Sequence, residues 1–220
     1  PTSSESTAGI AEIATQAEVN AGTDDARIVT PEKPLNAPML YRKNVIINGD
    51  MMVWQRGTTF TDVSDGAYTA DRWQIVEATD AVVTLTRSTD VPTAAEAGGS
   101  FAASLKLAVT TADASIGSTQ VCCLQTMIEG YDIRGLTSGN VTMSFWVKAT
   151  KTGTYCVVLR NAGADRVYPV EYTINNTGTW EKKTIVIPLN TGVASGTWDY
   201  TNGIGLTIRF IIAAGSSYAN

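Results

Sequence analysis

The order of hydrophobic and polar residues divides the chain into a short helical front segment and a long series of strands. From Ile10, small apolar residues recur at helical spacing until Gly22, which can end the helix. This apolar stripe consists of Ile10, Ile13, Ala14 and Ala17. The residues before Pro31 are extended because proline disfavours a helix before it, and further prolines form a stiff linker. We therefore predict a helical segment and linker over residues 1–39.

From residue 40 onward the pattern changes to that of strands. Short segments rich in Val, Ile, Thr and aromatic residues alternate with turns that contain Gly and Asn. A run at 43–49 ends in the turn signal Asn48-Gly49, and the predicted strands that follow are 72–78, 81–88, 103–110, 118–128, 140–149, 153–162, 168–174, 180–189 and 203–214. No amphipathic segment long enough for a helix interrupts these predicted strands. The chain is therefore predicted to be mainly β, with an antiparallel β-sandwich of the jelly-roll type over residues 40–220 behind the short α-helical segment.

Composition and charge exclude several classes of partner. Charged residues make up 17% of the chain and the formal net charge is −5, whereas nucleic-acid binding calls for clustered Lys and Arg. No apolar run approaches the roughly 20 residues of a membrane helix, and no signal peptide is visible at the start. We expect no nucleic acid partner and no membrane insertion.

The chain has no histidine and three cysteines. The absence of histidine removes Ser-His-Asp and Cys-His catalysis and histidine-ligated zinc. Cys122 and Cys123 are adjacent and Cys156 is alone, so they lack the spacing of a metal site, and we expect buried, reduced thiols. We predict no cofactor and no metal. A calcium ion held by Asp50 and a late-strand carboxylate is the alternative that remains open.

One loop carries a set of residues typical of sugar binding. The sequence "SGTWDYTNG" brings together Trp198, Asp199, Tyr200 and Asn202. An aromatic ring can stack on a sugar while carboxylate and amide groups hydrogen-bond its hydroxyls. The alternative is that the aromatic residues only fix the turn. Trp54, Trp73 and Trp180 are expected to pack in the core.

Charged residues near the first tryptophans allow a structural and a chemical interpretation. We expect Arg56 and Arg72 to stack on tryptophan and pair with carboxylates, which would hold the loop between the first strands. Capture of a sugar or phosphate by the same arginines is the alternative. A glycosidase would need two carboxylates, for which the candidates are Asp62, Asp65, Asp71, Glu129 and Asp132. No motif places any two of them together, and no β-helix repeat is present. We therefore predict that the protein is not an enzyme.

Two stretches resemble parts of bacteriophage tail fibre proteins. The sequence "ATQAEVNAGTDDARIVTPEK" at 14–33 resembles a connector segment of tail fibre and tail collar proteins. The residues Asn48-Gly49-Asp50, the run 53–57 and the run 68–73 resemble the opening of the tail-fibre β-sandwich domain. Segments 145–149 and 180–188 fit the same domain but recur in carbohydrate-binding jelly rolls. Such domains usually continue past the equivalent of "FIIAAGS" to a closing strand, which implies a truncated or partly cleaved fibre.

The resemblance implies a structural virion protein. In this family the front segment attaches to phage tail or baseplate proteins, the fibre is usually a homotrimer, and the sandwich contacts host surface polysaccharide. The expected location is the virion, after assembly in the host bacterial cytoplasm. A short helix buries its apolar stripe when copies of the helix pack around the symmetry axis of an oligomer, in agreement with this expectation. The alternative is a carbohydrate-binding module or a polysaccharide-degrading tailspike.

Overall fold

The computed structural model describes residues 12–21, 27–29, 44–189 and 196–218. The chain divides into two compact units, Pro1–Asn44 and Val45–Asn220. No helix of the described residues is long and apolar enough to cross a membrane. The two units are described separately below.

The N-terminal unit contains one helix, α1 (Gln16–Ala21), which begins later than predicted. Thr15 and Glu18 form a capping box, in which the Glu18 amide donates to Thr15 Oγ1 at 3.3 Å and the Thr15 amide donates to Glu18 Oε2 at 2.8 Å. The chain before this cap is extended, with Ile13 in a parallel bridge to Ile28. The predicted helix start at Ile10 lies outside the described residues.

The predicted apolar stripe is therefore wrong as a single helical face. Ala14 is buried beside the bridge, Ala17 is an exposed helical residue, and Ile13 is an extended residue that is 56% exposed. The capping box is the physical reason, because it fixes the helix start between Ala14 and Ala17. Ile10 cannot be compared, since it is outside the described residues.

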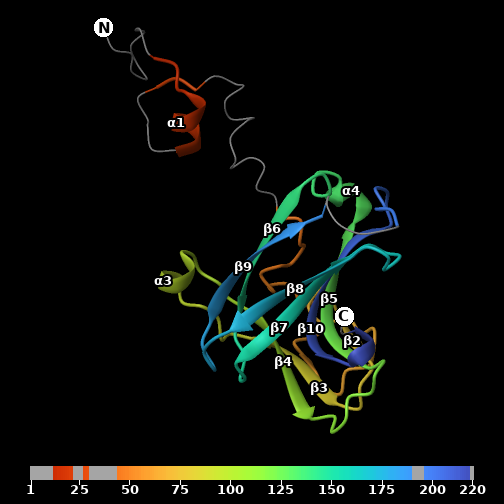
Figure 1. The fold of residues 1–220 in the computed structure, drawn as a ribbon. Coiled ribbons are helices and arrows are strands. Elements are labelled where there is room, and N and C mark those ends of the chain that lie inside the picture. Colours follow the sequence, from red (N-terminus) through yellow and green to blue (C-terminus); the bar gives the residue numbers. More distant parts are fainter. Residues whose placement is uncertain (1–11, 22–26, 30–43, 190–195, 219–220) are drawn as a thin grey trace. The chain divides into compact units, whose positions relative to one another are not determined.

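The second unit is the predicted antiparallel β-sandwich (Figure 1). Its strands are β1 (Thr59–Phe60), β2 (Trp73–Glu77), β3 (Val82–Ser88), β4 (Ser104–Thr111), β5 (Val121–Glu129), β6 (Asn140–Val147), β7 (Gly153–Arg160), β8 (Val167–Ile174), β9 (Glu181–Pro188) and β10 (Ile204–Ala214). Between or after them lie α3 (Ala94–Ala97), α4 (Gly130–Ile133) and the 3₁₀ turn η1 (Ser216–Tyr218). The mainly β sandwich predicted from the sequence is confirmed.

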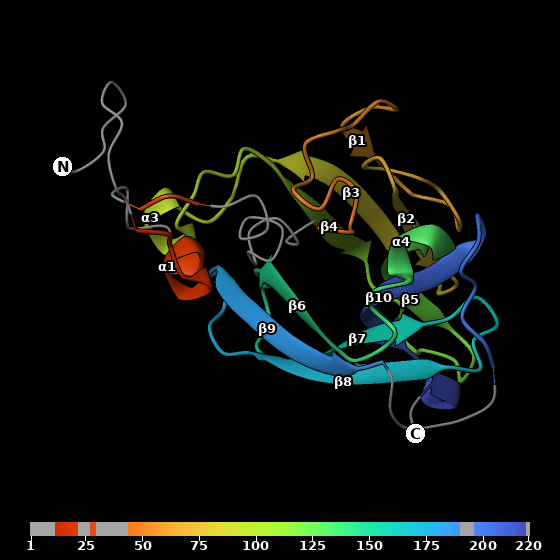
Figure 2. The same ribbon diagram turned by 90° about the horizontal axis from the view of Figure 1, so that it is seen from above.

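The strands form three antiparallel sheets. The largest has five strands in the order β2-β5-β10-β7-β8, and the others have the orders β1-β3-β4 and β6-β9. Strand β10 lies between β5 and β7, so the last strand pairs with two strands that precede it by a long stretch of chain. In Figure 2, β6 and β9 lie beside β7 and β8, whereas β3 and β4 lie toward β2 and β5.

The five-stranded sheet packs against both smaller sheets and so makes two cores. The larger core joins it to β6 and β9 through aliphatic residues such as Leu159, Ile187 and Ile208. The smaller core joins β2 and β5 to β3 through Ile75, Leu85 and Cys122. The alternation predicted for β6 is confirmed, since its residues at 141, 143, 145 and 147 all contact the larger core.

The turn predicted at Asn48-Gly49 is confirmed, since residues 47–50 form a turn in which Asn48 has φ +53°. Val45 and Ile46, which precede this turn, pack on the larger core. The sequence interpretation missed two short helices. A second capping box, formed by Thr93 and Glu96, starts the short helix α3. Helix α4 directly follows β5 and was included in no predicted element.

The three cysteines are free thiols, as predicted. Cys122 points into the smaller core, and its neighbour Cys123 is also buried but faces the opposite side of the sheet. Burial raises the pKa of the Cys122 thiol, with a further rise from the Glu77 carboxyl, and burial raises the pKa of Cys123 to about 11. Cys156 is half-buried, and burial raises its pKa as well.

Two neighbours on β9 test the assignment of the larger core. Ile187 is 0% exposed and Val186 is 57% exposed. We expect Ile187→Ala to lower the free energy of unfolding by about 2–5 kcal/mol, because it removes buried methyl groups and leaves a cavity. Val186→Ala should change it by about 0.5 kcal/mol or less. Urea unfolding of both variants is the measurement, and equal losses would contradict the assignment.

Candidate functional site

The predicted sugar-binding loop is held tightly against the sandwich. The ring of Trp198 stacks on Tyr168 with centroids 6.4 Å apart and an interplanar angle of 10°. The guanidinium carbon of Arg166 lies 5.8 Å from the same ring centroid. Trp198 is half-buried and packs against the larger core. Its ring therefore serves packing across the end of β8.

Asp199 and Tyr200 also make internal contacts. Asp199 Oδ1 accepts hydrogen bonds from the Thr201 amide and hydroxyl, both at 2.6 Å, and these bonds hold the pKa of Asp199 below its usual value. The Tyr200 carbonyl accepts from Arg134 Nη2 at 2.9 Å, and its hydroxyl is 2.8 Å from Thr137 Oγ1. These bonds fix the loop to the segment that follows α4.

The close approach of this loop to α4 depends on Gly130. The Gly130 amide donates to the Gly203 carbonyl at 2.9 Å, and the Tyr131 amide donates to the Thr201 carbonyl at 2.9 Å. A Cβ on Gly130 would lie 2.4 Å from the Asp199 carbonyl oxygen, so no larger residue fits without a backbone shift.

Asn202 is the one predicted loop residue that reaches a groove in the described part of the chain. The groove has a volume of about 270 Å³. It is lined by Tyr68, Arg72, Met127, Ile128, Glu129, Asn202, Gly203 and Ile204. The structure thus brings Asn202 together with residues from the predicted strands 72–78 and 118–128, and separates it from the Trp198 ring. The glycan-binding role of Trp198, Asp199 and Tyr200 stays a prediction.

An ion pair forms one side of the groove. Arg72 Nη2 donates to Glu129 Oε1 at 2.5 Å and to the Met127 carbonyl at 3.2 Å. Arg72 has φ +73°, a left-handed conformation that is unfavourable for a residue with a long side chain. The contacts with β5 hold the residue in this conformation and direct its guanidinium across the strand end.

Tyr68 supplies the aromatic surface of the groove. Its side chain is 38% exposed, and the guanidinium carbon of Arg56 lies 5.5 Å from its ring centroid. The sequence interpretation placed Tyr68 in the run 68–73 of the resemblance but did not name it as a binding residue. The same run contains Arg72, which lines the same groove.

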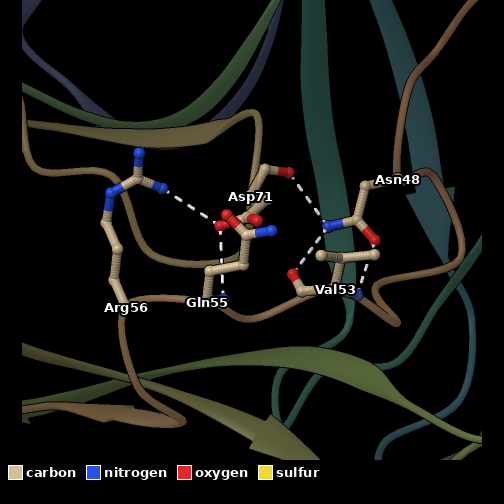
Figure 3. A network of polar contacts seen from close by, with 5 residues as sticks. All are labelled: Asn48, Val53, Gln55, Arg56 and Asp71. Atoms are coloured by element: carbon tan, nitrogen blue, oxygen red, sulfur yellow. Dashed lines mark hydrogen bonds and ion pairs between the residues drawn. The ribbon is translucent and has the colours of Figure 1, made fainter.

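The motif residues around the groove form a hydrogen-bonded network (Figure 3). Asn48 Nδ2 donates to the carbonyls of Val53 and Asp71 at 3.0 and 2.9 Å, and Asn48 Oδ1 accepts from the Val53 amide at 2.9 Å. Asp71 Oδ1 accepts from Arg56 Nη1 at 3.0 Å. Trp73 Nε1 donates to the Asn48 carbonyl at 3.0 Å. The network fixes the loop that precedes Tyr68 and Arg72.

The expectation for the two arginines is confirmed in part. Both pair with carboxylates, Arg56 with Asp71 and Arg72 with Glu129. The aromatic partner of Arg56 is Tyr68 instead of a tryptophan, because the Trp54 indole turns to donate to the Met51 carbonyl at 2.7 Å. Trp73 is buried as expected. Trp54 and Trp180 are half-buried.

Two of the carboxylates named as acid and base candidates are engaged in contacts away from the groove lining. Asp65 accepts from the Glu77 amide at 3.0 Å, and Asp71 is held by Arg56. Of the described candidates, only Glu129 lines the groove. Within residues 12–21, 27–29, 44–189 and 196–218, no three His, Cys, Asp or Glu side chains converge as metal ligands, and Asp50 joins no such group.

The groove therefore offers an aromatic face, an amide and a fixed pair of opposite charges. This combination suits a ligand with both apolar faces and hydroxyl groups, because the ring can stack while the polar groups hydrogen-bond. Comparisons with family descriptions and with curated proteins found no match to the chain. The assignment of a ligand thus depends on the groove and on the sequence resemblance.

Gly130 provides a test of the contact between the loop and α4. We expect Gly130→Ala to destabilise the sandwich by about 1–3 kcal/mol, because the new Cβ would collide with backbone atoms of Asp199 and Thr201. Gly135→Ala is the matched control, since an added Cβ there meets no atom within 4 Å. Thermal unfolding measures both variants. A Gly130→Ala protein that melts like Gly135→Ala would show that the loop can move away at little cost.

Proposed function

We propose that the chain is a structural virion protein, a phage tail fibre whose sandwich contributes to recognition of host surface polysaccharide. The observation that carries the proposal is the groove that combines Tyr68, the Arg72–Glu129 pair and Asn202. The residues that line and fix this groove include those of the resemblance to tail fibre proteins, namely Asn48, Asp71 and Arg72. Sequence and geometry thus point to the same surface.

The chemistry of the groove supports binding of a saccharide. Tyr68 presents part of its ring to solvent, which a sugar ring can cover. Asn202 is exposed and can donate and accept hydrogen bonds, while Arg72 and Glu129 add a donor and an acceptor at fixed positions. The loop around Asn202 is held by Arg134 and the Gly130 contact, so little order has to be gained on binding.

The N-terminal unit supports the attachment role. Ile13 and Ile28 are joined by a bridge, and Ile13, Ile28 and Val29 are 56%, 52% and 46% exposed. Neighbouring exposed aliphatic residues of this kind mark a surface that gains stability when another chain covers it. This surface replaces the helical stripe as the physical argument for a homotrimer and for contact with tail or baseplate proteins.

A polysaccharide-degrading tailspike is less well supported. Glycoside hydrolysis uses two carboxyl groups that flank the scissile bond. In the described residues the groove contains one carboxylate, Glu129, and that group is paired with Arg72. A carbohydrate-binding module would use the same groove, and attachment to tails distinguishes it from a fibre.

The groove residues should affect glycan binding without affecting the fold. We expect Tyr68→Ala and Asn202→Ala each to weaken binding to host polysaccharide by about 1 kcal/mol or more, through loss of stacking and of hydrogen bonds. Phe101→Ala is the matched control, because Phe101 is an exposed aromatic residue that lies outside the groove. Calorimetry on purified polysaccharide measures binding. Unchanged binding in both groove variants would refute this site, and release of reducing ends would identify an enzyme.

Removal of residues 1–38 tests attachment and assembly together. We expect the full chain to sediment as a trimer, and the shortened chain to keep a folded sandwich but to be lost from tail particles. The reason is that the exposed aliphatic surface lies wholly in the removed segment. Sedimentation and copurification with tails are the measurements. A shortened chain that still copurifies with tails would refute the attachment role, and a monomeric full chain would refute the trimer.

A further inference from the structure

The five-stranded sheet has an outer face that points away from both cores. On β7, Val157 and Leu159 enter the larger core, so Val158 and Arg160 point outward. On β10, Leu206 and Ile208 enter that core, so Thr207 and Arg209 point outward. We call this surface, made of Gln125, Val158, Arg160, Thr207 and Arg209, the arginine face.

The register places the two arginines next to each other. Thr207 pairs with Arg160, and Arg209 pairs with Val158. Arg160 and Arg209 are therefore diagonal neighbours on adjacent strands, a spacing that long side chains easily bridge. Two like charges in this arrangement repel each other unless an anion lies between them.

Arg209 is oriented by a chain of glutamines. Its Nε donates to Gln125 Oε1 at 2.8 Å, and Gln125 Nε2 donates to Gln74 Oε1 at 2.6 Å. Gln125 is 7% exposed and Thr207 is 4% exposed, so the floor of the arginine face is buried. The guanidinium of Arg209 is thus held in place, and its orientation is set before any ligand arrives.

Arg160 has a buried donor without a partner. Its Nε is inaccessible to solvent and makes no hydrogen bond in the described structure. Burial lowers the pKa of Arg160, and the positive charge of Arg209 lowers it further. A charged guanidinium with a donor that lacks an acceptor is unfavourable, so an anion that reaches the Arg160 side chain is expected to stabilise it.

No carboxylate of the described residues forms an ion pair with either arginine. The acidic groups that act electrostatically on Arg160 are the Cys123 thiol and the Tyr218 phenol. Burial raises the pKa of Cys123 to about 11, so the thiol is neutral at pH 7. The chain carries a net charge of −5, and yet neither arginine has an ion-pair partner among the residues that the structure describes. Within this part of the chain the arginine face therefore lacks an anion.

We propose that Arg160 and Arg209 bind an oxyanion, the carboxylate or phosphate group of an acidic saccharide. Guanidinium groups are planar forks that hold carboxylate and phosphate oxygens through paired hydrogen bonds. Thr207 pairs with Arg160 on one side and with Met127, a groove residue, on the other. Arg160 and Met127 are therefore separated by two strand spacings, about 10 Å, with Thr207 between them.

The position of the arginine face next to the groove indicates that the ligand is an acidic saccharide. A saccharide that stacks on Tyr68 can extend over Thr207, and an acidic substituent then meets the two arginines. The saccharide part of the inference rests on the proposed function, whereas the oxyanion site rests only on the arginine face. A neutral glycan would leave the arginines without a partner, so we expect selectivity for acidic over neutral forms.

Calorimetry on the full chain tests the proposal with three probes. These are oligogalacturonate as the carboxylate, glucose 1-phosphate as the phosphate, and fully methyl-esterified oligogalacturonate as the neutral form. We expect at least one anionic probe to bind and the methyl ester to bind at least about tenfold more weakly. The preference between the two anionic probes identifies the group. Failure of both anionic probes to bind would overturn the proposal.

The variants Arg160→Gln and Arg209→Gln locate the binding. Each should lower the affinity for the anionic probe about tenfold or more. Arg87→Gln, which removes an exposed arginine from β3, should leave the affinity unchanged. Equal weakening by Arg87→Gln would assign the effect to net charge and overturn the site.

Thermal unfolding provides a second measurement that also checks folding. Inorganic phosphate should raise the melting temperature of the native chain and of Arg87→Gln, but not that of Arg160→Gln. An equal rise in Arg160→Gln would overturn the site. Tyr68→Ala separates the two proposals. If this variant no longer binds polysaccharide but is still stabilised by phosphate, both the groove and the arginine face are supported as sites. If the native chain binds no polysaccharide but its stabilisation by phosphate requires Arg160, the glycan role is refuted and the oxyanion site is supported.

Discussion

The hydrogen bonding of β10 along both of its edges is the constraint on which the sandwich depends. This strand joins β5 to β7 and so makes one five-stranded sheet from two pairs of strands. Its inner residues complete the larger core, and its outer residues Thr207 and Arg209 complete the arginine face. The start of β10 passes close to α4: a Cβ at Gly205 would lie 2.7 Å from the Gly130 Cα. One strand thus fixes the core, the loop before it and the outer surface.

The two candidate surfaces differ in how their charges are satisfied. In the groove, Arg72 is paired with Glu129 and the motif network around Asn48 and Asp71 supports it. On the arginine face, Arg209 is oriented by neutral glutamines, and Arg160 keeps a donor without an acceptor. A paired charge is suited to orient a neutral hydroxyl-rich ligand, whereas unpaired charges favour an anion. The strand register links the two surfaces, because Thr207 pairs with Met127 of the groove on one side and with Arg160 on the other.

The sequence predicted the regular part of the fold and little of the candidate site. The strands with alternating residues, such as β6, and the buried cysteines followed from periodicity and residue type. The helix start at Thr15 was missed because a local capping box outweighed the spacing of small apolar residues. At the loop, the residue types did not determine the directions of the side chains: Trp198 packs inward, while Asn202 reaches the groove. Tyr68, Arg160 and Arg209 come together only through strand order, and no local pattern reports which strands are neighbours.

The placement of the cysteines determines how the molecule behaves when the redox potential of its surroundings changes. Cys122 and Cys123 are consecutive but point to opposite sides of β5, so a bond between their sulfur atoms would require that strand to break. Because burial raises the pKa of both thiols, little thiolate forms at neutral pH, and thiolate is the species that oxidants attack. A chain folded under reducing conditions can therefore pass into an aerobic medium with these two side chains chemically unchanged.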